Sequence, residues 1–373
     1  AGQPPAQIGI LLPLNGKLSG AAGAIRDGIA AAYYDTPEGG LRPELRIYDS
    51  GDTPESAVNA YHNAVADGAQ FVIGPLRKES VQALAALQPL PVPVLGLNQA
   101  RDQLQHNPAL YQFGLAPEDE AREVARLAWR NGHSRAIALL PETDWGERVY
   151  NAFATEWQML GGNIIDSRRY DPGKADHGSA IKGVLNLDAS KARQLQLTRK
   201  LGRNLQFEPR RRQDIDFAFL AASPRQARLI KPQLNFYRAS DLPVYATSHV
   251  YTGYPDKNKD ADMNGIVFCD TPWTLEQRNN WDHLQQSITE FWPGDAARYA
   301  RLYALGIDAY RIIPYLGNLD GGMFSAYHGV TGNLSLGEGG RVNRTLRCAT
   351  FRQGLPTLLE TGTAGTSAAT ALR

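Results

Sequence analysis

The sequence lacks long apolar runs and any large excess of charge. No stretch approaches the roughly 18 consecutive apolar residues that a transmembrane helix needs. The formal net charge is +1, which is too close to zero to favour nucleic acid as the main partner. Residues 1–5 have neither the charged start nor the apolar centre of an export signal. We therefore expect a cytosolic protein, or a mature or excised piece of an exported one.

Signatures of catalysis and metal binding are also missing. Residues 15–19 contain a Gly-Lys pair, but Leu18 stands where a phosphate loop needs Ser or Thr, and the preceding glycine is wrongly spaced. There is no G-x-G-x-x-G after a strand and no G-x-S-x-G elbow. The 7 histidines are scattered without ligand spacing. The sequence therefore predicts no cofactor, no metal site and no enzymatic activity.

Cysteine is scarce, with only Cys269 and Cys348 in the chain. Both lie in apolar, strand-like segments without a metal-ligand pattern. They are either two buried thiols or a disulfide. A disulfide would indicate an oxidising compartment and, in the chain-entropy model, would stabilise the fold by roughly 4 kcal/mol.

What is present is a repeated alternation of strands and helices. Residues 7–16 predict a strand buried on both faces, and a helix with apolar positions Ile25, Ile29 and Ala32 follows to about residue 35. The alternation predicts an α/β fold with two doubly wound parallel sheets. Further strands are predicted at residues 44–49, 71–73, 92–97, 111–117, 136–140, 163–165, 217–220, 244–246 and 265–269.

The chain is too long for one typical core, so two lobes are expected. We assign residues 1–115 and 270–325 to the first lobe, and residues 116–269 and 326–360 to the second. Residues 332–347 predict a hairpin. The small, polar residues 361–373 are expected to be a disordered tail.

Ligands of such sheets usually bind at the carboxyl ends of the strands, which here would face a cleft between the lobes. Trp145 is ambiguous, since it could lie against a ligand or pack at the start of a helix. Candidate cleft residues are Asn15, Ser19, Pro75, Leu76 and Asn98 in the first lobe and Trp145, Ser223, Ser248 and Tyr251 in the second.

A basic segment spans residues 191–212, where eight cations face one acid, Glu208. It lies in a long insertion between two predicted strands, so it belongs to the surface. It is either a solvated charged helix or a docking patch for an acidic protein surface or an anionic polymer. The docking candidates are Arg199, Lys200, Arg203, Arg210, Arg211 and Arg212.

Two α/β lobes in series, to each of which the chain returns late, resemble the type I periplasmic binding protein fold. Residues 71–75 (FVIGP) and 112–119 (QFGLAPED) carry this resemblance. A narrower resemblance, to the LppC/LpoA family, rests on GPLRKESV (74–81), VLGLN (94–98), RRQDIDF (211–217), AASPRQAR (221–228) and LPVYATSH (242–249).

The family resemblance implies an outer-membrane lipoprotein that faces the periplasm and activates a class A penicillin-binding protein, a peptidoglycan synthase. This chain would be the C-terminal domain, an excised piece without the family's lipidated cysteine and N-terminal helical-repeat domain. Peptidoglycan is a candidate further partner. Membrane contact is expected only through the lipid anchor.

The resemblance to transport receptors breaks down at two strand ends. Amino-acid receptors of this fold usually place small hydroxyl residues there, whereas this chain has Leu76-Arg77-Lys78 and Leu97-Asn98. Bulky, basic residues do not suit a zwitterionic amino acid. We therefore favour a non-enzymatic activator of a class A penicillin-binding protein. The alternative is a periplasmic receptor that closes its lobes on an amino acid or a cell-wall fragment.

Overall fold

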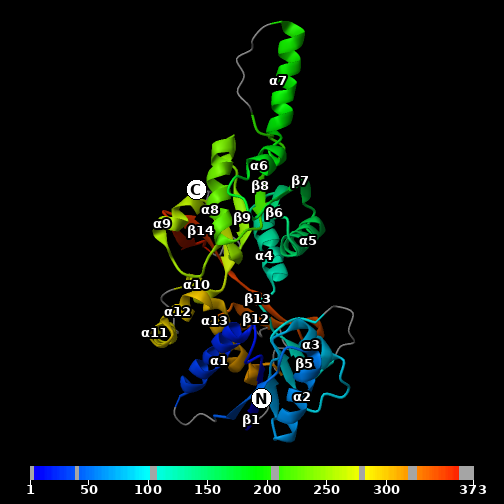
Figure 1. The fold of residues 1–373 in the computed structure, drawn as a ribbon, viewed down its shortest axis with the longest axis vertical. Helices are drawn as coiled ribbons and strands as arrows, with labels where there is room; N and C mark the ends of the chain where they lie inside the picture. Colours follow the sequence, from blue (N-terminus) through cyan, green and yellow to red (C-terminus); the bar gives the residue numbers. More distant parts are fainter. Residues whose placement is uncertain are drawn as a thin grey trace, which may run out of the picture.

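The computed structural model describes residues 4–37, 42–100, 107–202, 210–276, 282–317 and 326–360. Two lobes, each built on its own sheet, lie end to end along the long axis of the molecule (Figure 1). One helix, α7, extends from the far end of the second lobe. The predicted α/β class with parallel sheets is confirmed.

The first lobe has a five-stranded parallel sheet in the order β2-β1-β3-β4-β5. Its strands are β1 (Gln7–Leu12), β2 (Glu44–Asp49), β3 (Phe71–Ile73), β4 (Val94–Gly96) and β5 (Leu110–Gln112). Its helices are α1 (Ser19–Tyr34), α2 (Pro54–Ala66), α3 (Lys78–Ala85), α10 (Pro272–Leu275), α11 (Asp282–Phe291), α12 (Pro293–Arg298) and α13 (Ala300–Arg311). Ile8 and Ile10 are buried against α1 and α13, whereas Leu11 is buried against α2 and α3. Because side chains alternate along a strand, both faces of β1 are covered.

Helix α13 comes late in the chain but packs directly on α1. A Cβ added at Gly28 would meet the carbonyl oxygen of Tyr303, and one added at Gly306 would meet that of Ile25. The two backbones therefore touch at a crossing that only glycine permits. This contact fixes α13 in the first lobe.

The second lobe has a seven-stranded sheet in the order β15-β14-β10-β9-β8-β6-β7. The strands from β6 to β10 pair in parallel, while β14 and β15 form an antiparallel edge. The strands are β6 (Arg135–Pro141), β7 (Asn163–Tyr170), β8 (Phe217–Leu220), β9 (Val244–Thr247), β10 (Ile266–Asp270), β14 (Arg347–Arg352) and β15 (Leu355–Leu358). The helices are α4 (Pro117–Arg130), α5 (Asp144–Met159), α6 (Gly178–Val184), α7 (Leu187–Leu201), α8 (Pro224–Leu234) and α9 (Lys257–Asp260).

A small third sheet changes the expected division of the chain. It contains β11 (Tyr327–His328), β12 (Asn333–Leu336) and β13 (Val342–Thr345), of which β12 and β13 form the predicted hairpin. Leu334 and Val342 pack into the apolar cluster of the first lobe. The chain therefore joins the second lobe's sheet only at Arg347, later than the expected residue 326. The predicted tail, residues 361–373, lies outside the described residues.

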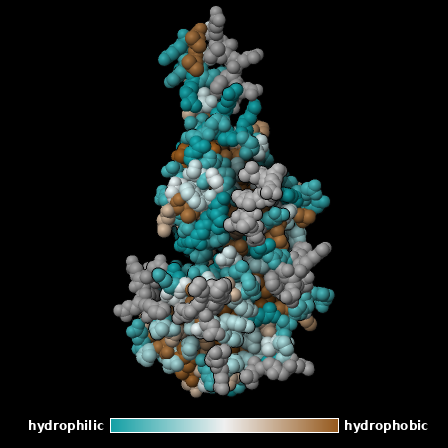
Figure 2. Space-filling model, turned by 180° about the vertical axis from the view of Figure 1, so that it is seen from behind, coloured by the Kyte–Doolittle hydropathy of each residue, from teal (hydrophilic) through white to brown (hydrophobic). Residues whose placement is uncertain are grey.

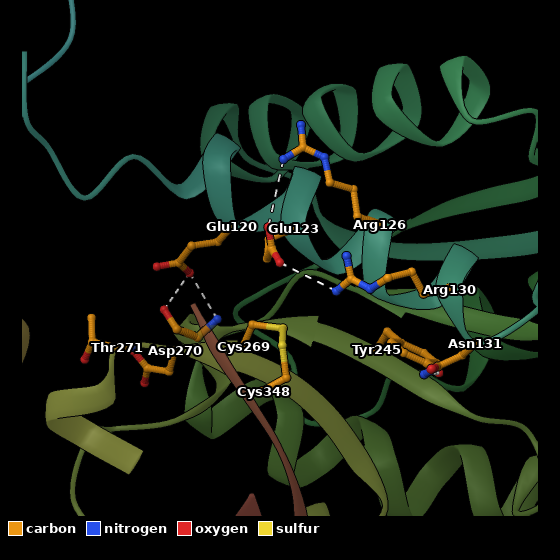
Figure 3. Close-up of a disulfide and its surroundings, with 11 residues drawn as sticks. Glu120, Glu123, Arg126, Arg130, Asn131, Tyr245, Cys269, Asp270, Thr271 and Cys348 are labelled. Carbon is orange, nitrogen blue, oxygen red and sulfur yellow. Dashed lines mark hydrogen bonds and ion pairs between the residues drawn. A yellow bond between two sulfur atoms is a disulfide. The ribbon is translucent and has the colours of Figure 1, made fainter. Parts of the chain in front are cut away.

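Of the two alternatives for the cysteines, the structure contains the disulfide. Cys269 on β10 and Cys348 on β14 stand opposite each other in the antiparallel ladder, 79 positions apart in sequence. The bridge lies beneath α4, and Cys269 is next to Asp270 (Figure 3). It links the antiparallel edge formed by β14 and β15 to β10, the last strand of the parallel part of the sheet.

Candidate functional site

A cleft of about 850 Å³ lies between the lobes. The first lobe contributes the end of β4, the start of α3 and part of α13, and the second contributes the starts of α4 and α5. Four cations line it, and they come from α3, α4, α5 and the loop before β13. They are Lys78, Arg122, Arg148 and Arg341.

Some of the positive charge in the cleft is balanced within the chain. Arg148 Nη1 lies 3.5 Å from Glu118 Oε1, and Arg122 Nη1 donates to Asp119 Oδ1 at 2.7 Å. Leu302 and Leu305 of α13 add an apolar lining. Acidic residues already occupy the first turns of both α3 and α4, and two of them, Glu79 and Glu118, line the cleft. The four cations still outnumber these two acids, so the lining favours an anion with an apolar portion.

Of the predicted cleft residues, only Leu76 and Asn98 line this cavity. The Asn98 amide is occupied within the chain, since Nδ2 donates to the Leu76 carbonyl and Oδ1 accepts from the Gln99 N–H. Pro75 is buried, and its carbonyl accepts from the Leu97 N–H. The sequence located the ends of β3 and β4 correctly, but the Asn98 side chain there forms hydrogen bonds within the local turns.

The other predicted residues of the first lobe lie outside the cavity. Asn15 is exposed and donates to Asp49 Oδ2 at 3.2 Å, and Ser19 is exposed at the start of α1.

In the second lobe the predicted residues have structural partners. The Trp145 ring lies edge-on to His249 with 5.0 Å between ring centroids, as expected for a packing Trp. Ser223 Oγ accepts from the Gln226 N–H and caps α8. Ser248 and Tyr251 belong to a buried network where the lobes meet.

The cleft cations were missed as site residues. Lys78, Arg122 and Arg148 lie in the first two turns of helices that follow strands, so helix starts after strand ends were the available signal. Arg341 lies just before β13, which packs on the first lobe although it comes late in the sequence. No local sequence pattern predicts that it lines the cleft.

Arg301 of α13 connects the first lobe to the second. Its Nε and Nη2 donate to Asp270 at 2.9 and 2.6 Å, and Nη2 also donates to the carbonyls of Ser248 and Tyr251. Asp270 is completely buried at the end of β10. Since a buried carboxylate needs a partner of opposite charge, this pair holds α13 against the strand ends of the second lobe.

Glu120 of α4 lies on the other side of the same junction, pointing toward the strand ends beside Asp270 (Figure 3). One carboxylate oxygen accepts from the Ser248 N–H at 3.1 Å and from Ser248 Oγ at 2.6 Å. The buried Arg344 guanidinium lies 4.0 Å from the other oxygen. Burial lowers the pKa of the neighbouring His249, although the Glu120 charge opposes this shift.

Ser248, His249 and Glu120 are residue types of a catalytic triad, but their arrangement is not that of one. Ser248 Oγ donates directly to Glu120, and His249 Nδ1 lies 2.9 Å from Thr247 Oγ1. A triad needs the imidazole between the hydroxyl and the carboxylate. Here the Ser248 hydroxyl bonds to the carboxylate with no imidazole between them, and the cluster fixes the junction.

Two kinds of feature are absent from the described ranges. No cluster of His, Cys, Asp and Glu in this part of the chain could hold a metal ion. None of its helices is long and apolar enough to cross a membrane.

The basic segment has two parts: an arm, which is helix α7 (Leu187–Leu201), and the base of the arm, where Arg211 and Arg212 lie. Arg199 and Lys200 are exposed on α7, and Arg210 is exposed after it. Arg203 lies outside the described residues. Arg211 and Arg212 differ from the expectation: their side chains are only 10% and 15% exposed.

These two arginines form ion pairs within the lobe. Arg211 Nη2 lies 2.6 Å from Asp241, and Arg212 Nε lies 2.7 Å from Asp214. Their guanidinium groups anchor the base of α7, so they are not part of an exposed docking patch.

Comparisons with known proteins agree with this architecture. The chain is similar to the penicillin-binding protein activator LpoA of Photobacterium profundum, with 30% identity over 348 residues, 92% of this chain and 55% of that protein. It resembles the solved C-domain of Haemophilus influenzae LpoA, described as a regulator of PBP1A (TM-score 0.72, 25% identity, 95% of this chain and 100% of that one). The leucine-binding protein LivK of Thermotoga maritima shares the fold (TM-score 0.54, 17% identity, 95% and 98% covered).

The chain spans about half the length of the curated relatives it matches. The model of the LppC lipoprotein family matches residues 1–354, which is nearly all of the sequence. The chain therefore belongs to the LppC family.

Proposed function

We propose that this chain binds a class A penicillin-binding protein at the periplasmic face of the outer membrane and activates peptidoglycan synthesis without catalysing it. The observation that carries the proposal is the match to the whole C-domain of a Haemophilus protein described as a regulator of PBP1A. The disulfide supports an oxidising compartment such as the periplasm. The side chains of Ser248 and His249 bond to Glu120 and Thr247 within the junction, and this structural use supports a non-catalytic role.

Activation without catalysis requires differential binding. The chain would bind the active conformation of the synthase more tightly than the inactive one and shift the population by that difference. A tenfold preference corresponds to about 1.4 kcal/mol. The Arg301–Asp270 contact favours a body whose lobes keep one relative orientation, as a binding template should.

The test is a titration of a purified class A penicillin-binding protein with this chain. Binding is followed by calorimetry and glycan polymerisation by the rate of lipid-linked substrate consumption. We expect saturable binding and a rate that rises over the same concentration range. A leucine-binding receptor of the same fold is the matched control. If the chain neither binds nor changes the rate at concentrations where the synthase is fully active, the proposal is wrong.

A small-molecule site in the cleft is the second candidate, because the cavity is large and lined by Lys78, Arg122, Arg148 and Arg341. Thermal unfolding would test it with amino acids, with peptidoglycan fragments and with 4-hydroxybenzoate, an anion that has an apolar ring. An anion that binds should raise the melting temperature of the unmodified chain but not of an Arg148→Gln variant. Equal shifts in both proteins, or none, would leave the cleft without this role.

A further inference from the structure

Helix α7 projects from the end of the second lobe that is farthest from the first lobe (Figure 1). Leu187 and Ser190 in its first turn are buried, but from Lys191 to Leu201 every residue is exposed except the half-buried Gln194 and Thr198. Isolated helices of about 12–15 residues are only marginally stable in water. Packing against the core of the lobe therefore does not explain why residues 191–201 form a helix.

The helix carries an excess of positive charge. Lys191, Arg193, Arg199 and Lys200 are its basic residues, and Asp188 is its one acid. Arg193 and Lys200 are separated by seven positions and share one face with Leu197, whereas Arg199 projects from another side of the helix. Within the described ranges no ion pair joins these four cations to another residue, in contrast to Arg211 and Arg212 at the base.

Exposed leucines accompany these cations. Leu195, Leu197 and Leu201 are 49%, 51% and 59% exposed. Figure 2 shows hydrophobic and hydrophilic residues side by side on the arm. Apolar area that faces water is a source of binding free energy when a partner covers it. The arm thus combines the two features that a docking surface needs, charge for encounter and apolar area for affinity.

The base gives the arm a defined direction. Asn186 adopts a left-handed conformation (φ 59°) at the turn between α6 and α7. The returning chain is held by the Arg212 N–H, which donates to the Leu185 carbonyl, and by the ion pairs of Arg211 and Arg212. Ala189 and Ala192 are exposed on α7, and their short side chains would let a partner approach the helix backbone closely.

We propose that this chain docks on the synthase through the exposed part of α7, from Lys191 to Leu201. The matching surface of the synthase would be an acidic patch with shallow apolar pockets that accept the leucines. The inference rests on the proposed function and names the docking surface and its partner chemistry. Complementary charge would accelerate encounter and make the association sensitive to salt.

The experiment compares two triple variants of the full chain. The arm variant is Arg193→Gln, Arg199→Gln and Lys200→Gln, which keeps good helix formers in place. The control is Lys17→Gln, Lys257→Gln and Arg352→Gln, which removes the same charge from exposed positions elsewhere. Circular dichroism verifies that both variants fold.

Binding to a purified class A penicillin-binding protein is measured at 0.05 and 0.3 M salt. We expect the arm variant to raise Kd about tenfold at low salt and to lose most of the salt dependence, while the control stays within about twofold. A Leu197→Ser, Leu201→Ser variant should weaken binding at both salt concentrations. If the unmodified chain binds and the arm variant binds equally well, the inference fails alone. If the unmodified chain does not bind, the proposed function fails and the inference with it.

Discussion

The two ends of the second lobe use charged side chains in opposite ways. Where it meets the first lobe, Asp270 and Glu120 are buried and each faces an arginine of the first lobe or of its small sheet. At the other end, Arg193 and Lys200 are exposed on α7. Buried pairs contribute to a fixed geometry and are costly to break, whereas exposed cations contribute little to stability. The buried pairs therefore hold the lobes together at the junction, whereas these cations of α7 face solvent.

Removal of the disulfide is expected to have the largest effect at the junction end. A Cys269→Ala, Cys348→Ala variant loses a cross-link between positions 79 apart. In the chain-entropy model its free energy of unfolding should fall by about 4 kcal/mol. Urea unfolding of the variant, and of the unmodified chain with and without reductant, measures this. A variant as stable as the oxidised chain would show that the edge strands hold without the bond.

Breaking the buried ion pair should cost nearly as much. Asp270→Ala leaves the Arg301 guanidinium, whose side chain is 23% exposed, with only two carbonyl acceptors. We expect a loss of about 3 kcal/mol, because a charge without its partner remains partly buried. Lys174→Ala is the control in the same lobe, because Lys174 and its partner Asp171 are 72% and 50% exposed, and it should cost less than about 1 kcal/mol. Equal losses would mean that burial does not set the cost of breaking an ion pair here.

The sequence offered the disulfide as one of two alternatives, but it gave no sign of the buried ion pair. The strands, the helices after them and the hairpin were predictable because hydrophobic period and turn residues act locally. Arg301 and Asp270 meet only because α13 packs on α1 through Gly28 and Gly306. Contacts between segments so far apart in sequence depend on tertiary packing.

The candidate site was predictable to a smaller extent for the same reason. The strand-end prediction located Leu76 and Asn98 at the cleft, but the cations there come from four separate elements. In the basic segment, charge alone did not distinguish Arg211 and Arg212 from the exposed arginines. Their carboxylate partners Asp241 and Asp214 become visible only once the lobe is folded.

Histidine burial gives the second lobe a pH dependence of its own. His177 is buried at the start of α6, and its ring nitrogens have no hydrogen-bond partner among the described residues. Burial lowers its pKa, although Asp176 and Asp171 oppose the shift. Below the ordinary pKa of about 6.5 the unfolded chain takes up a proton that the folded chain resists, so stability should fall as the pH falls.

A His177→Phe variant tests this reasoning. Its free energy of unfolding should decrease less than that of the unmodified chain between pH 7.5 and 5.5, by about 1 kcal/mol. Burial also lowers the pKa of His249 at the junction, so part of the pH dependence should remain in the His177→Phe variant. Parallel pH profiles for the unmodified chain and His177→Phe would mean that His177 is hydrated or paired in solution.

The smallest expected change in stability belongs to the arm itself. The triple Gln variant at Arg193, Arg199 and Lys200 should alter the free energy of unfolding in urea by no more than about 0.5 kcal/mol, because exposed charges without partners contribute little. Arg212→Gln at the base should cost about 1 kcal/mol, since that guanidinium is paired with Asp214 and 15% exposed. Hydrogen exchange of the α7 amides should increase in the base variant and not in the arm variant. If the arm variant is the less stable of the two, the exposed cations hold the helix in place and are not reserved for a partner.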